Sequence, residues 1–220
     1  MKLHLGCGMT LLEGFVNIDN SPTVLLAKMP YAIPAILSKI SLVNQYQLEF
    51  LKTLRGSHFN LRYANVLKLP FNDNSVDFCY SSHMLGWCLS YGQLNRFARE
   101  VYRVLKPGGA GRLSFFDFDK LLDTYRQHRS TVQLMERMPL GIREFTWRQK
   151  LKFLFSPNMN NGIPLNAETL TPILEAAGFV NIRVVGAGET GLETAMVEGV
   201  DLAERPNESV YMECRKKSES

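Results

Sequence analysis

Two glycines that follow a short apolar run, and an aspartate soon after them, are the first chemical feature of this chain. Residues 3–5 favour a strand, and Gly6-Cys7-Gly8 form a tight turn at its end. Glycines let the backbone approach a ligand closely and leave its N–H groups available to a carboxylate or a phosphate. Asp19 ends the next predicted strand, where a carboxylate can accept hydrogen bonds from both hydroxyls of a ribose. A nucleoside-containing ligand suits both parts, although such a glycine turn also occurs as a plain turn without a ligand.

A nicotinamide dinucleotide is the first ligand to weigh against this pattern. The dinucleotide fingerprint requires a third small residue three positions after the second glycine, and Leu11 stands there. It also requires a full helix after the turn, whereas residues 9–14 allow only about one helical turn before the next strand. The sequence therefore disfavours a nicotinamide-dependent oxidoreductase.

The elements that must position these residues alternate between short strands and amphipathic helices, a pattern typical of an α/β fold with a mainly parallel sheet. We expect strands at residues 3–5, 15–19, 59–63, 76–80, 111–116, 181–185 and 209–214. The clearest helix is residues 93–105, and Pro107-Gly108-Gly109 should end it. A second helix covers residues 167–177, with Asn166 as N-cap and Gly178 at its end. Pro172 leaves two interpretations of that helix: a kink, or a late start with Thr171 as the cap.

Three further stretches carry a family resemblance. They are residues 64–77, which contain Asn65 and Val66, residues 80–85, which contain Ser81, Ser82 and His83, and residues 103–109, which end in Lys106-Pro107-Gly108-Gly109. Together with the glycine turn, and in this order and spacing, they resemble the type 11 group of class I S-adenosylmethionine-dependent methyltransferases. The resemblance covers the chain up to the second strand, residues 62–118 and, more loosely, residues 166–216.

The resemblance implies a Rossmann-like, seven-stranded, mostly parallel sheet with helices on both faces and a last antiparallel strand. It implies a single domain over residues 1–216, a flexible tail at 217–220, and S-adenosylmethionine as cofactor, with S-adenosylhomocysteine as product. By position, Gly6, Cys7 and Gly8 would contact the methionine part, Asp19 the ribose, Asn65 and Val66 the adenine, and Ser81 with Ser82 the pocket after the fourth strand.

Four places depart from the family pattern. The family usually has an acidic residue at His4, a third glycine at Thr10, an aspartate at Asn65, and a Leu-Glu-His where Leu85-Gly86-Trp87 stand. Each change weakens the expected hold on the cofactor; an amide, for example, accepts a hydrogen bond less strongly than a carboxylate. Two functions therefore stay open. One is a methyltransferase for a small-molecule, sugar or lipid-linked acceptor, and the other is a non-catalytic cofactor-binding homologue that supports a partner protein.

His83 and Asp117 are the candidates for a general base, which is needed only if the acceptor is a poorly acidic hydroxyl or a protonated amine. His83 follows the fourth strand, where the resemblance puts the methyl group, and an unperturbed histidine has a pKa of about 6.5. It would otherwise cap the next helix or pack in the pocket wall. Asp117, like Asp119, follows the fifth strand and would otherwise cap a helix that begins near Lys120. His4 should be a buried, hydrogen-bonded histidine, and the dispersed histidines form no metal-ligand pattern.

Two segments, about 21–57 and 121–164, exceed a minimal alternating scaffold, and both follow the carboxyl end of a strand. That edge carries the ligand crevice in open α/β sheets, so both are candidate lids over the acceptor. Residues 126–152 are basic and aromatic, which suits an anionic acceptor or a peripheral contact with a membrane, and equally a solvated helix face over a core stripe. Residues 23–43 would either line an apolar acceptor pocket or form an ordinary buried helix pair.

Composition limits the class of protein. The 220 residues are 45% apolar and 21% charged with a net charge of +4, which is ordinary for a globular domain and makes nucleic acid an unfavoured partner. The four cysteines are scattered without a C-x-x-C pair, as suits a reducing compartment. The first residues do not resemble a signal peptide, and the lysines and prolines of residues 23–43 argue against a transmembrane helix. We therefore expect a cytoplasmic protein, and the sequence leaves its oligomeric state open.

Overall fold

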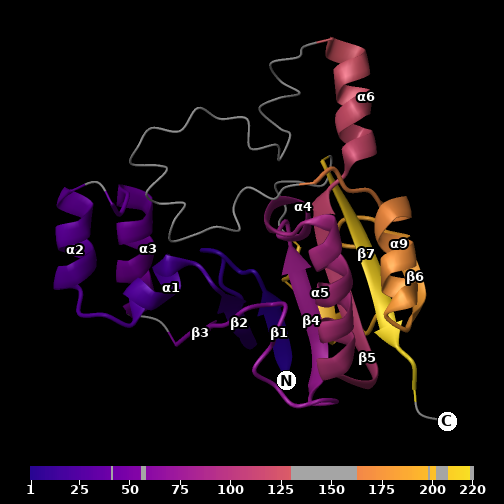
Figure 1. Ribbon diagram of the computed structural model, residues 1–220, viewed down its shortest axis with the longest axis horizontal. Helices are drawn as coiled ribbons and strands as arrows, with labels where there is room; N and C mark the ends of the chain where they lie inside the picture. Colours follow the sequence, from indigo (N-terminus) through magenta and orange to yellow (C-terminus); the bar gives the residue numbers. More distant parts are fainter. Residues whose placement is uncertain (41, 56–57, 130–162, 198, 202–207, 219–220) are drawn as a thin grey trace.

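A computed structural model describes residues 1–40, 42–55, 58–129, 163–197, 199–201 and 208–218 (Figure 1). Its centre is a seven-stranded sheet with the order β3-β2-β1-β4-β5-β7-β6. The strands are β1 (Lys2–Leu5), β2 (Phe15–Asp19), β3 (Asn60–Tyr63), β4 (Val76–Ser82), β5 (Leu105–Phe116), β6 (Phe179–Val185) and β7 (Ser209–Lys216). Neighbouring strands from β3 to β5 are parallel, and β7 runs antiparallel to β5 and β6. The predicted mostly parallel, Rossmann-like sheet with a last antiparallel strand is confirmed.

Two strands begin at least two residues earlier than predicted. β5 begins at Leu105, which pairs with Val76, so the predicted stop signal at residues 107–109 lies inside the strand, where the register is irregular. Gly108 has a φ of +77°, and this conformation lets the backbone turn without leaving the sheet. β6 begins at Phe179 rather than at Asn181, which itself has a φ of +52° at a second irregularity in register. Both strands thus extend through residues whose local sequence indicates a turn.

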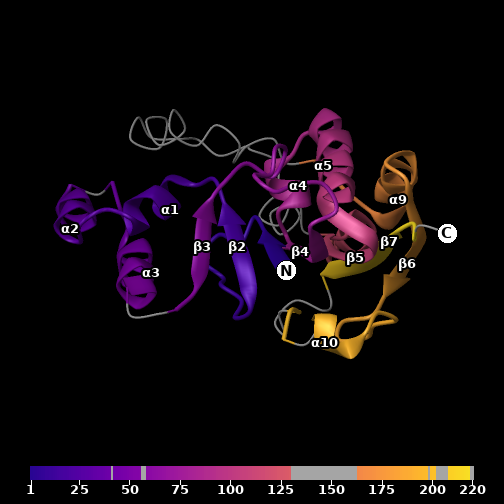
Figure 2. The same ribbon diagram turned by 90° about the horizontal axis from the view of Figure 1, so that it is seen from below.

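The helices lie on both faces of the sheet and beyond one end of it. They are α1 (Pro22–Ala27), α2 (Ala32–Lys39), α3 (Gln45–Arg55), α4 (Leu85–Cys88), α5 (Tyr91–Val104), α6 (Phe118–His128), α9 (Ala167–Ala176) and α10 (Thr194–Val197). Figure 2 shows α4, α5 and α9 over one face and α10 on the other. The group α1–α3 lies beyond β3, and α6 extends from the upper edge of the sheet in Figure 1. Within the described residues, no helix is long and apolar enough to cross a bilayer.

Alternation along the strands divides the buried side chains between the two faces. Leu3 and Leu5 belong to the larger apolar cluster, which packs under α5 and α9. Phe78 and Tyr80 belong to a smaller cluster on the opposite face, under the segment that contains α10. The upper ends of β1, β2 and β4 thereby emerge between two packed layers, as expected for the ligand-binding edge of such a sheet.

Capping residues determine where two of the helices begin. Ser90 and Gln93 form a capping box, so α5 starts at Tyr91, earlier than the predicted residue 93. The Asn166 side chain accepts a hydrogen bond from the Thr169 N–H (3.0 Å), and α9 starts at Ala167 as predicted. The alternative prediction, that this helix starts late with Thr171 as its cap, is therefore wrong, and Pro172 lies inside the helix.

The two candidate lids are only partly described. Residues 21–57 contain α1–α3 outside the sheet, and residues 121–128 belong to α6. Residues 130–162, with most of the basic stretch 126–152, lie outside the described residues, as do residues 219–220 of the predicted tail.

Candidate functional site

The glycine turn lies at the carboxyl end of β1 and is held to β2 by the backbone. The N–H groups of Gly6 and Cys7 both donate to the carbonyl of Ile18, at 2.8 and 3.0 Å. Gly6 and Gly8 have φ values of +67° and +54°, in the left-handed region that favours glycine. The turn therefore forms as the sequence predicts, and its geometry explains a glycine on each side of Cys7.

The two glycines differ in what lies in front of them. A Cβ at Gly6 would be only 2.6 Å from Cγ of Met84, so the Met84 side chain covers this residue closely. A Cβ at Gly8 would meet no atom within 4 Å. The turn thus has one packed end and one open end, and the open end is where a ligand could approach the backbone.

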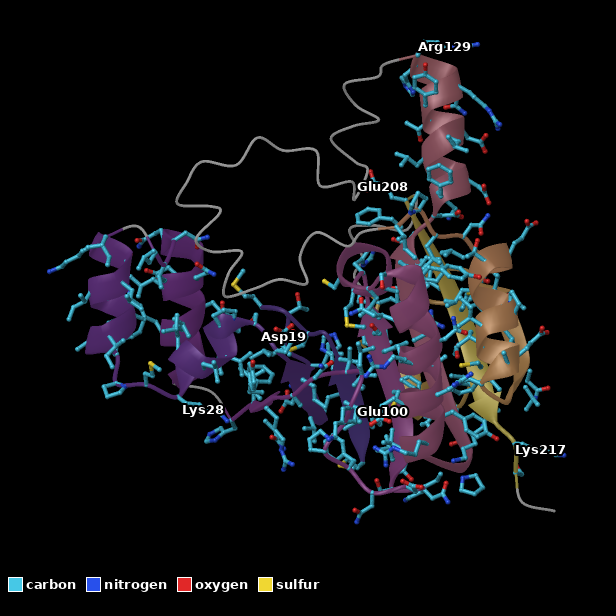
Figure 3. All side chains as sticks on the ribbon, viewed as in Figure 1. Asp19, Lys28, Glu100, Arg129, Glu208 and Lys217 are labelled. Atoms are coloured by element: carbon cyan, nitrogen blue, oxygen red, sulfur yellow. The ribbon has the colours of Figure 1, made fainter. Side chains whose placement is uncertain are left out.

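Asp19 lies beside this turn at the end of β2 (Figure 3). Its Oδ2 accepts a hydrogen bond from the Gly8 N–H (2.9 Å), and its Oδ1 accepts one from the Ser21 N–H (2.6 Å). Its backbone carbonyl accepts from the Ala64 N–H (3.1 Å), which attaches the segment after β3 to the same point. Carboxylate oxygens accept more than one hydrogen bond each, so both can still bind hydroxyl donors. The glycine turn and Asp19 are therefore one hydrogen-bonded unit.

Asn65 and Val66 follow β3 in a tight turn near the same edge. The Asn65 side chain is exposed, and its Oδ1 accepts a hydrogen bond from the Leu67 N–H (2.9 Å). The side chain of Val66 is buried in the main core. Of the two residues predicted to contact adenine, Asn65 therefore has an exposed amide and Val66 a buried side chain.

Ser81 and Ser82 end β4 and, as successive strand residues, point to opposite faces of the sheet. Ser81 is fully buried, and its hydroxyl has no hydrogen-bond partner among the described residues. The Ser82 hydroxyl lies 3.1 Å from that of Ser114 and 2.9 Å from Nδ1 of His83. The two serines, predicted to line one pocket together, therefore have different surroundings.

His83 follows the last residue of β4 and links it by side-chain contacts to the first residue of β7. Its Nε2 lies 2.8 Å from the Ser209 hydroxyl, opposite the contact of Nδ1 with Ser82, and its ring meets Phe116 edge-on. Its φ is +54°, and its N–H donates to the Ser114 carbonyl (2.7 Å). Both ring nitrogens therefore have a serine partner. Ser209 only opens the last strand in the sequence, and no motif marks it as part of this cluster.

Asp117 is the N-cap of α6. Its side chain accepts a hydrogen bond from the Asp119 N–H (3.1 Å), and the helix starts at Phe118 rather than near Lys120. The sequence predicts Asp117 either as a general base or as a helix cap. Its contacts are those of a helix cap. Asp119 in turn accepts from the Asn166 side chain (3.0 Å).

His4 is buried beside Asn17, as the sequence predicts. Its Nδ1 lies 3.1 Å from Oδ1 of Asn17, and it is 2% exposed. Burial lowers its pKa to about 4, although the hydrogen bond to Asn17 and the charge of Asp19 act in the opposite direction. His4 is therefore a neutral part of the sheet at pH 7.

An ionic cluster on the face under α10 has no signal in the sequence. The Arg112 guanidinium donates to Glu213 (2.6 Å), to Asp201 and to the Glu189 carbonyl (3.0 Å). Glu213 also accepts from Arg183, Thr190 and Gly191. Arg112 and Glu213 stand in the middle of strands whose neighbours are apolar or small, so only the register between β5 and β7 reveals the pair.

Comparison with known proteins finds a family resemblance over part of the chain. Residues 39–112 match the family model described as a methyltransferase domain. A malonyl-[acyl-carrier protein] O-methyltransferase of Marinomonas sp. (strain MWYL1) is 41% identical over 61 residues, which are 28% of this chain and 21% of that protein. The uncharacterized protein YafS of Escherichia coli (strain K12) is 34% identical over 96 residues, which are 41% of this chain and 38% of that protein. The chain thus spans well under half the length of these curated relatives.

A solved structure agrees on the fold. The SAM-dependent methyltransferase from Methanosarcina mazei is 17% identical and superimposes with a TM-score of 0.52, covering 99% of this chain and 92% of that one. The partial family match, the ordered motifs and the strand order agree with one another. Residues 39–112 thus resemble a methyltransferase domain, and the chain has the same fold as the Methanosarcina mazei protein.

Proposed function

We propose that this chain binds S-adenosylmethionine at the edge formed by β1, β2 and β4 and transfers its methyl group to an acceptor. The proposal rests above all on the bond between the Gly8 N–H and Asp19, which joins an open glycine turn to a carboxylate at the ends of two parallel strands. Ligands of open α/β sheets bind at that edge. The family match and the name of the Marinomonas relative support the same activity.

The described residues fit this cofactor. The open end at Gly8 admits a ligand close to the backbone, and Asp19 has two carboxylate oxygens for the two ribose hydroxyls. Asn65 and the backbone of Val66 lie after β3, on the side proposed for the adenine. S-adenosylmethionine supplies an electrophilic methyl group when bound. The protein's own contribution is to hold the acceptor in line with that group, an effect worth roughly 7–11 kcal/mol in oriented reactions.

The proposed acceptor is a small-molecule, sugar or lipid-linked group. The name of the Marinomonas relative suggests one more candidate, a malonyl group on a carrier protein. A malonyl thioester has a free carboxylate, which is already nucleophilic and needs no general base. Both ring nitrogens of His83 have serine partners, an arrangement that suits such an acceptor. For a hydroxyl or amine acceptor, His83 is the proposed base, and Asp117 is the second candidate.

Calorimetry tests the cofactor site directly. Wild type should bind S-adenosylmethionine and S-adenosylhomocysteine. Asp19→Ala should weaken both affinities by at least about a hundredfold, since it removes two hydrogen bonds to a charged group that contribute about 1.5–3 kcal/mol each. Asp123→Ala is the matched control because Asp123 is an exposed carboxylate on α6. Equal affinities in wild type and Asp19→Ala would contradict the assigned site.

A non-catalytic homologue is the second candidate function. One observation favours it: the Asn65 side-chain oxygen, which replaces the carboxylate usual in the family, already accepts the Leu67 N–H. A non-catalytic homologue should bind the cofactor, but the isolated protein should show no turnover. Transfer of a labelled methyl group to any acceptor by the isolated chain would exclude it.

A further inference from the structure

The outer face of α2 is apolar. Ile33, Ile36 and Ile40 are 39%, 58% and 57% exposed, and their i, i+3, i+7 spacing places them on one side of the helix and its C-cap. We call these three residues the isoleucine stripe. On the inner side, Pro34 is buried and α2 packs against α3, where Leu51 is fully buried. The helix is therefore apolar on its exposed side as well as on its packed side, contrary to an ordinary surface helix.

Further exposed apolar residues lie near this stripe in the sequence. Of the eleven large hydrophobic residues that are exposed in the described part of the chain, six lie between positions 25 and 42. They are Leu25, Met29, Ile33, Ile36, Ile40 and Leu42. Figures 1 and 2 show α2 at one end of the molecule, with α3 between it and the sheet. Clusters of this kind mark binding surfaces, whereas single exposed apolar residues are ordinary.

The segment that carries the stripe has charged side chains of one sign. Residues 20–48 contain no aspartate or glutamate, and both of their lysines, Lys28 and Lys39, are exposed. The first acidic residue after Asp19 is Glu49, which pairs with Lys52 on α3. An exposed apolar segment with lysines and no carboxylates of its own is the chemistry that an anionic membrane surface selects.

We propose that α1 and α2 bind the surface of an anionic lipid bilayer, with the isoleucine stripe in the interface and Lys28 and Lys39 on the headgroups. The charge favours this occupant over a second copy of the chain, because a symmetric contact through this face would bring the same lysines of both copies together. α1 begins three residues after Asp19, so the segment that carries this surface starts at the residue proposed to bind the ribose.

Cosedimentation with vesicles tests this surface without any need for methyl transfer. Wild type should bind vesicles of phosphatidylcholine and phosphatidylglycerol in equal parts, and bind pure phosphatidylcholine far more weakly. Ile36→Ser/Ile40→Ser should lower the partition coefficient at least about tenfold, since burying an isoleucine side chain is worth that factor. Lys28→Gln/Lys39→Gln should lower it about fivefold per lysine at low salt. The matched control is Val180→Ser/Val184→Ser, which removes two exposed valines on β6 and should bind like wild type.

Other outcomes would overturn the proposal. One is that wild type binds neither kind of vesicle. Another is that Ile36→Ser/Ile40→Ser binds vesicles as well as wild type does. Sedimentation equilibrium that shows a dimer, lost in Ile36→Ser/Ile40→Ser and without vesicle binding, would assign the face to a second copy. Binding of an acidic carrier protein, lost in the same variant and again without vesicle binding, would assign it to a protein partner. Thermal unfolding of each variant verifies that the fold is intact.

Discussion

Arg112 and Glu213 face each other on β5 and β7, with Nη1 of the arginine 2.6 Å from Oε1 of the glutamate and neither side chain more than 1% exposed. Asp201 and Thr190, which bind this pair, belong to the segment between β6 and β7. The pair therefore fastens the segment that contains α10 to the sheet. The attached segment covers the sheet face that carries Tyr80 of β4 and His4 of β1. β1 is the strand that ends in the glycine turn.

Glu213→Ala should lower the free energy of unfolding by about 3–5 kcal/mol, because it leaves the Arg112 guanidinium buried without one of its partners. Denaturant unfolding measures the change. Asp123→Ala is the control, since it removes an ion pair with Arg126 in which both side chains are mostly exposed, and it should cost under about 1 kcal/mol. Similar small losses in the two variants would mean that the buried pair adds little to stability.

Stability should decrease as the pH falls from about 6.5 to about 4, because of His4. Burial lowers the pKa of His4 in the folded protein to about 4, whereas an unfolded chain has the ordinary value of about 6.5. Between these values the unfolded chain binds a proton that the folded chain does not, so lower pH favours unfolding. The contribution of His4 to the free energy of unfolding is fully present above pH 6.5. About 3 kcal/mol of it is lost by pH 4.

Urea unfolding across this pH range measures the effect, and two variants isolate it. His4→Gln should be less stable overall yet show a flatter dependence on pH, because the titrating group is gone. His128→Gln is the control, since His128 is exposed on α6, and it should keep the wild-type slope. The explanation fails if both variants have the slope of wild type.

Gly6→Ala and Gly8→Ala should differ, although both glycines have positive φ values. At Gly8 the new methyl group meets open space, so only the backbone strain of about 1–2 kcal/mol is expected. At Gly6 it also collides with Met84, which adds about 1–3 kcal/mol for overpacking. Chemical denaturation of the single variants and of Gly6→Ala/Met84→Ala completes a double-mutant cycle. The double variant should regain part of the extra loss, and an additive result would show that Met84 does not press on Gly6.

Much of the fold follows from local sequence because the strands are short apolar runs bounded by turn residues. The glycine turn and Asp19 were also predictable, since positive φ and a strand-ending carboxylate are properties of single residues. The limits of β5 were not, because Leu105 joins the sheet by pairing with Val76, a partner distant in the sequence. Register, and not local pattern, decides such boundaries.

The same distinction applies to the site. Asp117 was predicted as a base or as a cap, and its contact with the Asp119 N–H is a local one that sequence spacing suggests. Two hydrogen-bond partners of His83 are not local: Ser209 comes from the opposite end of the chain, and Ser114 from another strand, whereas Ser82 is its neighbour in the sequence. The ionic cluster of Arg112 likewise forms only once β5 and β7 are in register. Sequence therefore identifies the side chains that can do chemistry more readily than the contacts that constrain them.

His83→Asn should distinguish the classes of acceptor. Asparagine tolerates the positive φ of this position, so the backbone should keep its course while the imidazole is lost. If the acceptor is a carboxylate, transfer of a labelled methyl group should stay within about tenfold of wild type, since no proton has to be removed. A hydroxyl or amine acceptor should lose roughly 10²–10⁴ in rate, because general base catalysis by a positioned side chain contributes that much. His128→Asn, on exposed α6, controls for the loss of an imidazole elsewhere, and a large loss with a carboxylate acceptor would mean that His83 positions the substrate.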